Sequence, residues 1–104
     1  MKTIEYMAAV KKHLHIDSDY ALAKALAVTK QTVSRYAQGK GYFDDEIAAR
    51  VATILGINPG IVVLDIHRER AKTPQDVALW NDIFAGFPAL SLHAKSVRSL
   101  ALPR

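Results

Sequence analysis

The sequence of 104 residues contains no cysteine, which excludes disulfide bridges and thiolate metal sites. No run approaches the ~20 consecutive apolar residues that a membrane-spanning helix needs. The opening stretch MKTIEYMAAVKK lacks the apolar segment of a secretory signal. Alternating β-branched and polar residues, the mark of a half-buried strand, are nearly absent. The expected compartment is therefore the cytoplasm, and no sheet is expected.

Acidic residues are missing from the stretch 20–43, although the whole chain carries only a mild net charge of +4. The basic residues inside this stretch are Lys24, Lys30, Arg35 and Lys40. The nearest acids lie just outside it, at Asp17, Asp19, Asp44, Asp45 and Glu46. A local basic window suits a polyanionic partner. The same pattern is also compatible with an ordinary solvated face.

What the chain does contain is alanine, leucine, isoleucine and valine at helical spacing, and half of the residues are apolar. Helices are predicted over residues 4–14, 19–26, 30–38, 45–55, 59–71 and 74–85. The expected fold is all-α, a compact five- to six-helix bundle. Residues 1–86 form its single domain, and residues 87–104 form a C-terminal tail.

Capping residues set these expected boundaries. The predicted N-caps are Thr3, Ser18, Thr29, Asp44, Asn58 and Thr73. Glycines are expected to end helices at Gly39 and Gly56, and Gly86 with Pro88 is expected to end the last one. The inward stripe expected for the first helix is Ile4, Met7, Val10 and Leu14.

The most informative stretch is 18–39, which reads as a short helix, a three-residue turn and a second short helix. The positions expected to face the core are Leu22, Ala23, Leu26, Val28, Val33 and Tyr36. The second helix is then left with a polar front: Lys30, Gln31, Thr32, Ser34 and Arg35. These side chains suit base edges, because arginine and lysine pair with guanine and glutamine pairs with adenine. An ordinary exposed face of a helical bundle is the alternative.

The segment ALAKALAVTKQTVSRYAQGK resembles the helix-turn-helix of lambda-type phage repressors and Cro proteins. The resemblance continues through DDEIAARVATILGINPG and covers roughly residues 4–66. The stretch LDIHRERAKTPQDVALW further resembles a small group of regulators encoded by filamentous phages and prophages. The resemblance implies a lambda-repressor-like bundle whose second and third helices form the motif, with the third helix in the major groove.

The resemblance also implies roles for individual residues. Base contacts fall on the first, second and sixth positions of the reading helix, here Lys30, Gln31 and Arg35, with Thr32 and Ser34 as second-rank candidates. Phosphate contacts fall on Ser18, Tyr20, Lys24 and Lys40. Two positions depart from the family pattern. Ala27 stands where the turn usually has glycine, and Asp19 places an acid where phosphate would approach.

The expected function is therefore sequence-specific binding of double-stranded DNA by a transcriptional regulator, a phage or prophage repressor. One such domain covers half an operator, so a homodimer on a palindromic site is expected. An aromatic stripe on the last helix offers the dimer surface: Trp80, Ile83, Phe84 and Phe87. Simple docking of that helix on the bundle would explain the same stripe.

Three other functions stay open at this stage. Catalysis has little support, because no HExxH pattern, nucleophile elbow or phosphate-gripping glycine loop is present; no enzyme activity, metal or cofactor is expected. An antitoxin-like module would bind a partner protein through the C-terminal helix and tail, residues 87–104. A DNA-bending protein is the third, although no winged hairpin supports it.

Overall fold

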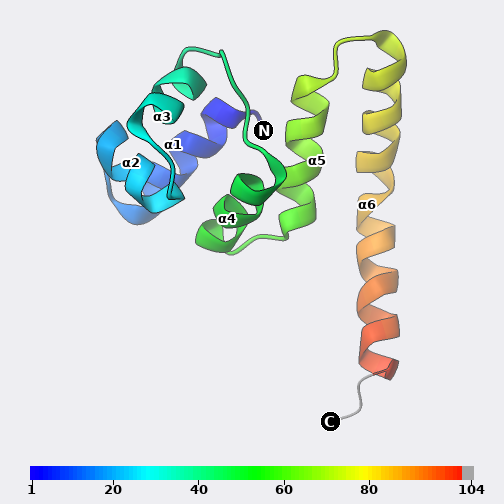
Figure 1. The fold of residues 1–104 in the computed structure, drawn as a ribbon. Coiled ribbons are helices and arrows are strands. Elements are labelled where there is room, and N and C mark those ends of the chain that lie inside the picture. Colours follow the sequence, from blue (N-terminus) through cyan, green and yellow to red (C-terminus); the bar gives the residue numbers. More distant parts are fainter. Residues whose placement is uncertain (102–104) are drawn as a thin grey trace.

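Six helices make up the computed structural model, which describes the backbone of residues 1–101 and the side chains of residues 1–87. They are α1 (Thr3–Leu14), α2 (Asp19–Leu26), α3 (Lys30–Ala37), α4 (Asp45–Leu55), α5 (Pro59–Arg70) and α6 (Pro74–Ala101), shown in Figure 1. Residues 1–101 contain no strand. The predicted all-α class is confirmed.

Side-chain caps begin five of these helices where the sequence predicts them. The cap oxygens accept backbone N–H groups at 2.8–3.1 Å, and the capping residues are Ser18, Thr29, Asp44, Asn58 and Thr73. Each cap satisfies an amide that the first turn leaves without an intrahelical partner. These local bonds fix where the chain changes direction, and so they set the relative placement of the short helices.

The core lies among α1 to α5, which together form the body of the molecule. Its fully buried side chains come from every one of these helices and from the loop before α4: Tyr6, Val10, Leu22, Leu26, Val33, Phe43, Val51, Val62 and Ile66. Burying such residues removes apolar surface from water, which stabilises the body at about 25 cal/mol per Å².

The buried face of α1 differs from the prediction. Met7 and Val10 are buried as expected, but Ile4 and Leu14 are 51% and 38% exposed. Thr3 is not the N-cap of α1, because it is the first helical residue and is itself buried. Its backbone N–H and its hydroxyl both donate to the Glu69 carboxylate of α5, at 2.8 Å. Because of these contacts with α5, the buried face of α1 differs from the apolar stripe that the sequence predicts.

The last helix is also longer than predicted. The sequence places its end near Ala85, before Gly86 and Pro88, but α6 continues to Ala101. Proline lacks the N–H that would bond to the carbonyl four residues earlier, which penalises a helix interior without forbidding it. The predicted boundary at residues 86 and 87 thus falls inside a continuous helix.

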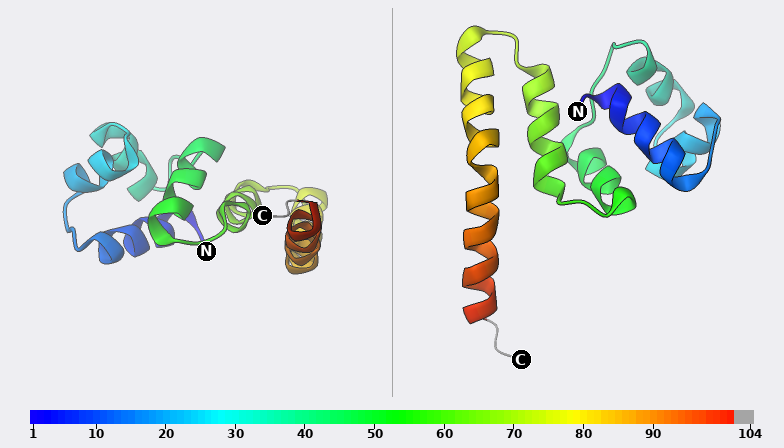
Figure 2. Two further views of the ribbon diagram at one scale, coloured as in Figure 1. Left: turned by 90° about the horizontal axis from the view of Figure 1, so that it is seen from below. Right: turned by 180° about the vertical axis from the view of Figure 1, so that it is seen from behind.

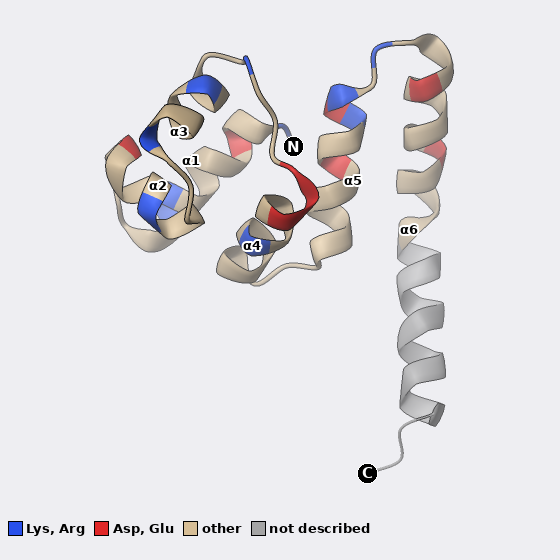
Figure 3. Cartoon of the chain, in the orientation of Figure 1, with Lys and Arg blue, Asp and Glu red and all other residues tan. Residues whose placement is uncertain are grey.

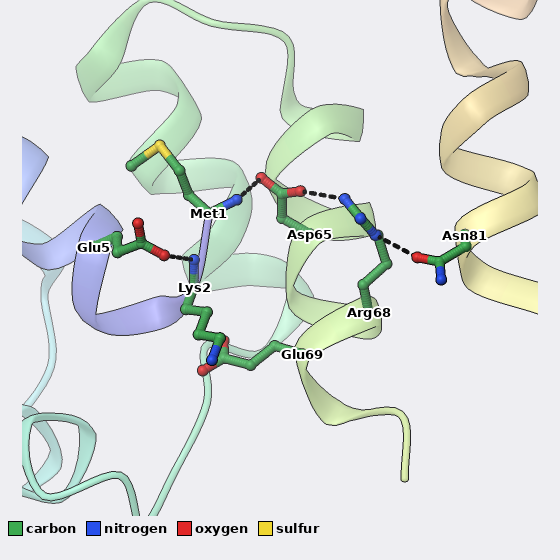
Figure 4. Close-up of a pocket in the computed structure, with 7 residues that line it drawn as sticks. All are labelled: Met1, Lys2, Glu5, Asp65, Arg68, Glu69 and Asn81. Carbon is green, nitrogen blue, oxygen red and sulfur yellow. Dashed lines mark hydrogen bonds and ion pairs between the residues drawn. The ribbon is translucent and has the colours of Figure 1, made fainter. Parts of the chain in front are cut away.

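Helix α6 packs beside α5, and α5 separates it from α1 to α4 (Figures 1 and 2). A polar network joins these parts (Figure 4). The buried Asp65 carboxylate accepts bonds from the Tyr6 hydroxyl and from the Met1 amino group, the latter at 2.9 Å. Arg68 donates to Asp65 and, at 3.0 Å, to Asn81 of α6. Burial and the Asp65 carboxylate raise the pKa of Tyr6 well above its ordinary value.

Candidate nucleic-acid interface

Helix α2 begins at a serine cap and buries one face. The Ser18 hydroxyl accepts the Ala21 N–H at 3.0 Å. The predicted inner residues Leu22, Ala23 and Leu26 are all buried, with 4% exposure or less. The small Ala23 lets neighbouring helices approach, and the two leucines anchor α2 to the core. Its opposite side therefore stays in solvent.

The turn from α2 to α3 consists of three residues, 27–29, and is held at both ends. Ala27 adopts the left-handed conformation that glycine favours, with φ of 55°, although this conformation costs an alanine about 1–2 kcal/mol. The Val28 N–H bonds to the Ala23 carbonyl at 3.0 Å, and its side chain packs against the core. Arg50 of α4 donates to the Leu26 carbonyl. This arginine fixes the turn from outside the two helices, a role that the sequence did not suggest.

Helix α3 starts at the predicted cap and ends one residue earlier than expected. The Thr29 hydroxyl accepts the Thr32 N–H at 3.1 Å, and the helix runs to Ala37. Gly39 follows with φ of 72°, a conformation that favours glycine. Val33 and Tyr36 point into the core, at 0% and 6% exposure. The back of α3 is therefore buried against the core.

The front of α3 carries the five predicted base-reading residues on an accessible surface. Lys30, Gln31 and Arg35 are exposed. Thr32 and Ser34 are half-buried and occupied by neighbours. The Thr32 hydroxyl lies 2.9 Å from that of Thr29, and the Ser34 hydroxyl is 3.3 Å from the Gln38 amide nitrogen. The three first-rank side chains are therefore the freest to reach a partner.

The four predicted phosphate-binding residues are all exposed, and they come from α2 with its cap and from the loop after α3. Tyr20 is 59% exposed on α2, and the Lys24 ammonium lies 5.1 Å from the centroid of its ring. Ser18 sits at the start of the same helix. Lys40 follows α3, where its backbone N–H bonds to the Arg35 carbonyl at 2.9 Å. Figure 3 shows basic residues on α2, α3 and the loop after it.

The loop after α3 contributes Tyr42, a candidate contact residue that sequence reasoning missed. Its neighbour Phe43 holds the loop in place. Phe43 is fully buried and meets the Tyr36 ring edge to face, with centroids 5.2 Å apart. This contact holds the loop along α3. A hollow of about 360 Å³ forms there, lined by Thr32, Arg35, Tyr36, Lys40, Gly41 and Tyr42. Tyr42, 36% exposed, lines this hollow together with three predicted contacts, Thr32, Arg35 and Lys40. An aromatic side chain inside the acid-free window was the available signal.

Basic and acidic side chains lie on different sides of this hollow. Burial, with a smaller effect from the Asp44 carboxylate, raises the pKa of Tyr36, and the Arg35 guanidinium opposes that shift. Tyr36 therefore stays neutral at ordinary pH. The acids Asp44, Asp45 and Glu46 gather at the start of α4, where they favour the helix dipole (Figure 3). The basic surface of α2 and α3 is bounded by acid on that side.

The four residues predicted for a dimer surface lie where α6 meets α5. Trp80 stacks on His67 with ring centroids 4.4 Å apart. Phe84 lies 4.2 Å from the Arg68 guanidinium, and Phe87 packs over Gly60. The fourth residue, Ile83, is half-buried. These contacts account for docking of α6 on α5, and a dimer role for the stripe stays a prediction. Of the predicted tail, residues 88–104 lie outside the described side chains.

A second hollow, of about 310 Å³, lies at the junction of α1, α5 and α6 (Figure 4). Its lining residues are Met1, Lys2, Glu5, Asp65, Arg68, Glu69 and Asn81. Most of its charged groups already bond to one another, as described above. Within residues 1–87 no buried polar side-chain atom lacks a partner, and no group of residues could hold a metal ion. The α2–α3 surface is therefore the better candidate site.

The searched helices include none that is both long and apolar enough to cross a bilayer. Comparison with known proteins finds a phage protein. The chain is 31% identical over 83 residues to the uncharacterized protein Gp-c of Pseudoalteromonas phage PM2. The aligned part is 75% of this chain and 89% of Gp-c. No protein-family model and no solved structure matches the chain.

Proposed function

The chain belongs to the same family as Gp-c of Pseudoalteromonas phage PM2, and we propose that it is a sequence-specific DNA-binding transcriptional regulator of the phage repressor type. In this proposal α2 and α3 act as a helix-turn-helix, and α3 enters the major groove. The protein works in the bacterial cytoplasm, on the nucleoid. Its relative gives phage context, and the chemistry of α3 gives the proposed activity.

The observation that carries the proposal is the division of α3 into two faces. Val33 and Tyr36 hold its back in the core, while Lys30, Gln31 and Arg35 stand free on its front. An α-helix fits the B-DNA major groove, which is about 12 Å wide. There arginine and lysine donate to guanine O6 and N7, and glutamine pairs with adenine. Such a face has little to gain from contact with an apolar protein partner.

Phosphate contacts supply affinity that does not depend on sequence. Lys24 and Lys40 flank α3, on the preceding helix and on the following loop. Tyr20 and Ser18 add hydrogen-bonding groups on the α2 side. Three to five neutralised phosphates per subunit would make the binding constant fall with salt, at a log–log slope of roughly −0.9 for each. Strong salt dependence is thus part of the proposal.

A homodimer completes the proposed regulator, because one α3 reads only half a site. Two copies would bind half-sites about 34 Å apart along the duplex. Helix α6 is the element proposed to join them, since Val77 leaves apolar surface exposed there, at 40%. The α5 contacts of the aromatic stripe need not break for this surface to be used.

Selection of bound duplexes from a random pool tests the proposal. The unchanged protein should enrich a two-fold symmetric motif. Arg35→Ala should relax preference at one base position in each half-site, at a cost of about 1–3 kcal/mol for the lost bidentate pair. Arg70→Ala is the matched control, because it removes the same charge from an exposed residue at the end of α5. It should leave the motif unchanged.

Two results would count against this reading. If the unchanged protein binds no duplex at low salt, the activity itself is wrong. If it enriches a motif that Arg35→Ala leaves intact, another element reads the bases.

A further inference from the structure

One ion pair links α1 to α2 at the edge of the proposed DNA surface. The Lys11 ammonium lies 2.8 Å from the Asp19 carboxylate. Both side chains are partly exposed, at 28% and 43%. Asp19 stands between Ser18 and Tyr20, two of the proposed phosphate contacts. It is the acid that departs from the family pattern, and the structure gives it a partner eight residues earlier in the chain.

We propose that Lys11 belongs to the DNA-contacting surface, where it cancels the charge of Asp19. This inference rests on the proposed function. A free carboxylate beside a phosphate would repel it, and the repulsion is strongest at low salt, where screening is weak. With Lys11 in place the two groups together carry no net charge. Ser18, Tyr20 and Lys24 can then approach the DNA backbone without repulsion from Asp19.

The neighbouring lysine shows that the placement of Lys11 is specific. Lys12 carries the same charge one position later, but it faces a different hollow, lined by Ala9, Lys12, His13, His15 and Leu55. No acid pairs with Lys12 among the described residues. Lys11 and Lys12 are thus equal in charge and unequal in position, which makes Lys12 a matched control.

A charge series on this pair tests the inference, using a fluorescent duplex of mixed sequence between about 50 and 200 mM KCl. The variants are Lys11→Gln, Asp19→Asn, the double variant and Lys12→Gln. Affinity should be highest for Asp19→Asn, equal for the unchanged protein and the double variant, and lowest for Lys11→Gln. Each step should change affinity about five- to tenfold at low salt and change the log–log salt slope by about 0.9. Lys12→Gln should change neither by more than a small fraction of these amounts.

A purely structural role for the pair predicts a different outcome. Both single variants would then lower the melting temperature, and Asp19→Asn would weaken DNA binding instead of strengthening it. Exposed ion pairs add little to folding stability, so all four variants should fold, as circular dichroism will verify. If Lys11→Gln and Lys12→Gln weaken binding equally, general charge explains the effect and the inference is wrong. If the unchanged protein ignores duplex DNA, the proposed function has failed instead.

Discussion

The body and α6 are held together in different ways. In the body, side chains from five helices interlock, and Leu22, Leu26 and Val33 have no exposed surface. Along α6, the described aromatic residues are only half-buried, and they meet α5 alone through one stacked ring, one arginine and one glycine. The first arrangement is a close-packed core. The second is a docked helix.

This difference bears on how the proposed interface is built. Every residue that positions α3 lies in the body: the caps, the turn at Ala27, the Arg50 bond to the Leu26 carbonyl and the buried back of α3. Among residues 1–87, none of these groups forms a hydrogen bond with α6. The proposed DNA-reading surface should therefore keep its structure when α6 is changed, whereas changes in the core beneath it should not be tolerated.

The largest expected effect is Leu26→Ala. Leu26 is fully buried under the turn between α2 and α3, so truncation removes apolar contacts and leaves a cavity. The free energy of unfolding should fall by about 2–5 kcal/mol, measured by urea denaturation. DNA binding should weaken with it, since the same residue supports α3. Leu79→Ala removes the same side chain from an exposed site on α6 and should cost within about 0.5 kcal/mol. Equal losses would contradict the comparison between body and α6.

A smaller and more local effect is expected from Gly60→Ala. A Cβ at this position would lie 2.7 Å from the Phe87 ring, so the ring must move. Overpacking of this kind costs about 1–3 kcal/mol, and here it weakens the packing of α6 against α5. Alanine's better helix propensity returns up to about 1 kcal/mol. The measurement is the fluorescence of Trp80, the single tryptophan, which stacks on His67 of α5.

Gly86→Ala is the control for this experiment, because nothing lies within 4 Å of the added Cβ. It should leave Trp80 emission and its quenching by acrylamide unchanged. Gly60→Ala should shift both while the body stays folded. An unchanged Trp80 signal in both variants would mean that α6 is not seated as described.

The two regions also differed in how well the sequence predicted them. Caps such as Thr29 and Asp44 were correct because a cap depends on bonds within one turn. The predicted inner face of α1 was partly wrong because Tyr6 and Thr3 donate hydrogen bonds to Asp65 and Glu69 of α5. These partners are more than fifty residues apart in the sequence, so a local pattern does not predict the contacts. The end of α6 was wrong because Gly86 and Pro88 were read as a stop when they only weaken a helix.

The candidate site shows the same limit. The exposed front of α3 followed from helical period alone, since Val33 and Tyr36 fix which side faces inward. The pairing of Asp19 with Lys11 did not, because it joins two helices whose relative placement the pattern leaves open. Tyr42 was missed for a similar reason: its position depends on the contact between Phe43 and Tyr36.

The smallest expected effect concerns Ala27 itself, where the body carries local strain. Its left-handed conformation, with φ of 55°, costs an alanine about 1–2 kcal/mol. Glycine removes that cost but gains more freedom in the unfolded chain, worth about 0.4–1 kcal/mol. Ala27→Gly should therefore stabilise the protein by up to about 1 kcal/mol in urea denaturation. Ala25→Gly, inside α2, should instead destabilise it by roughly 0.5–1 kcal/mol. If Ala27→Gly stabilises the protein and Ala25→Gly destabilises it, the left-handed turn begins at Ala27. If both variants lose stability, that geometry is wrong.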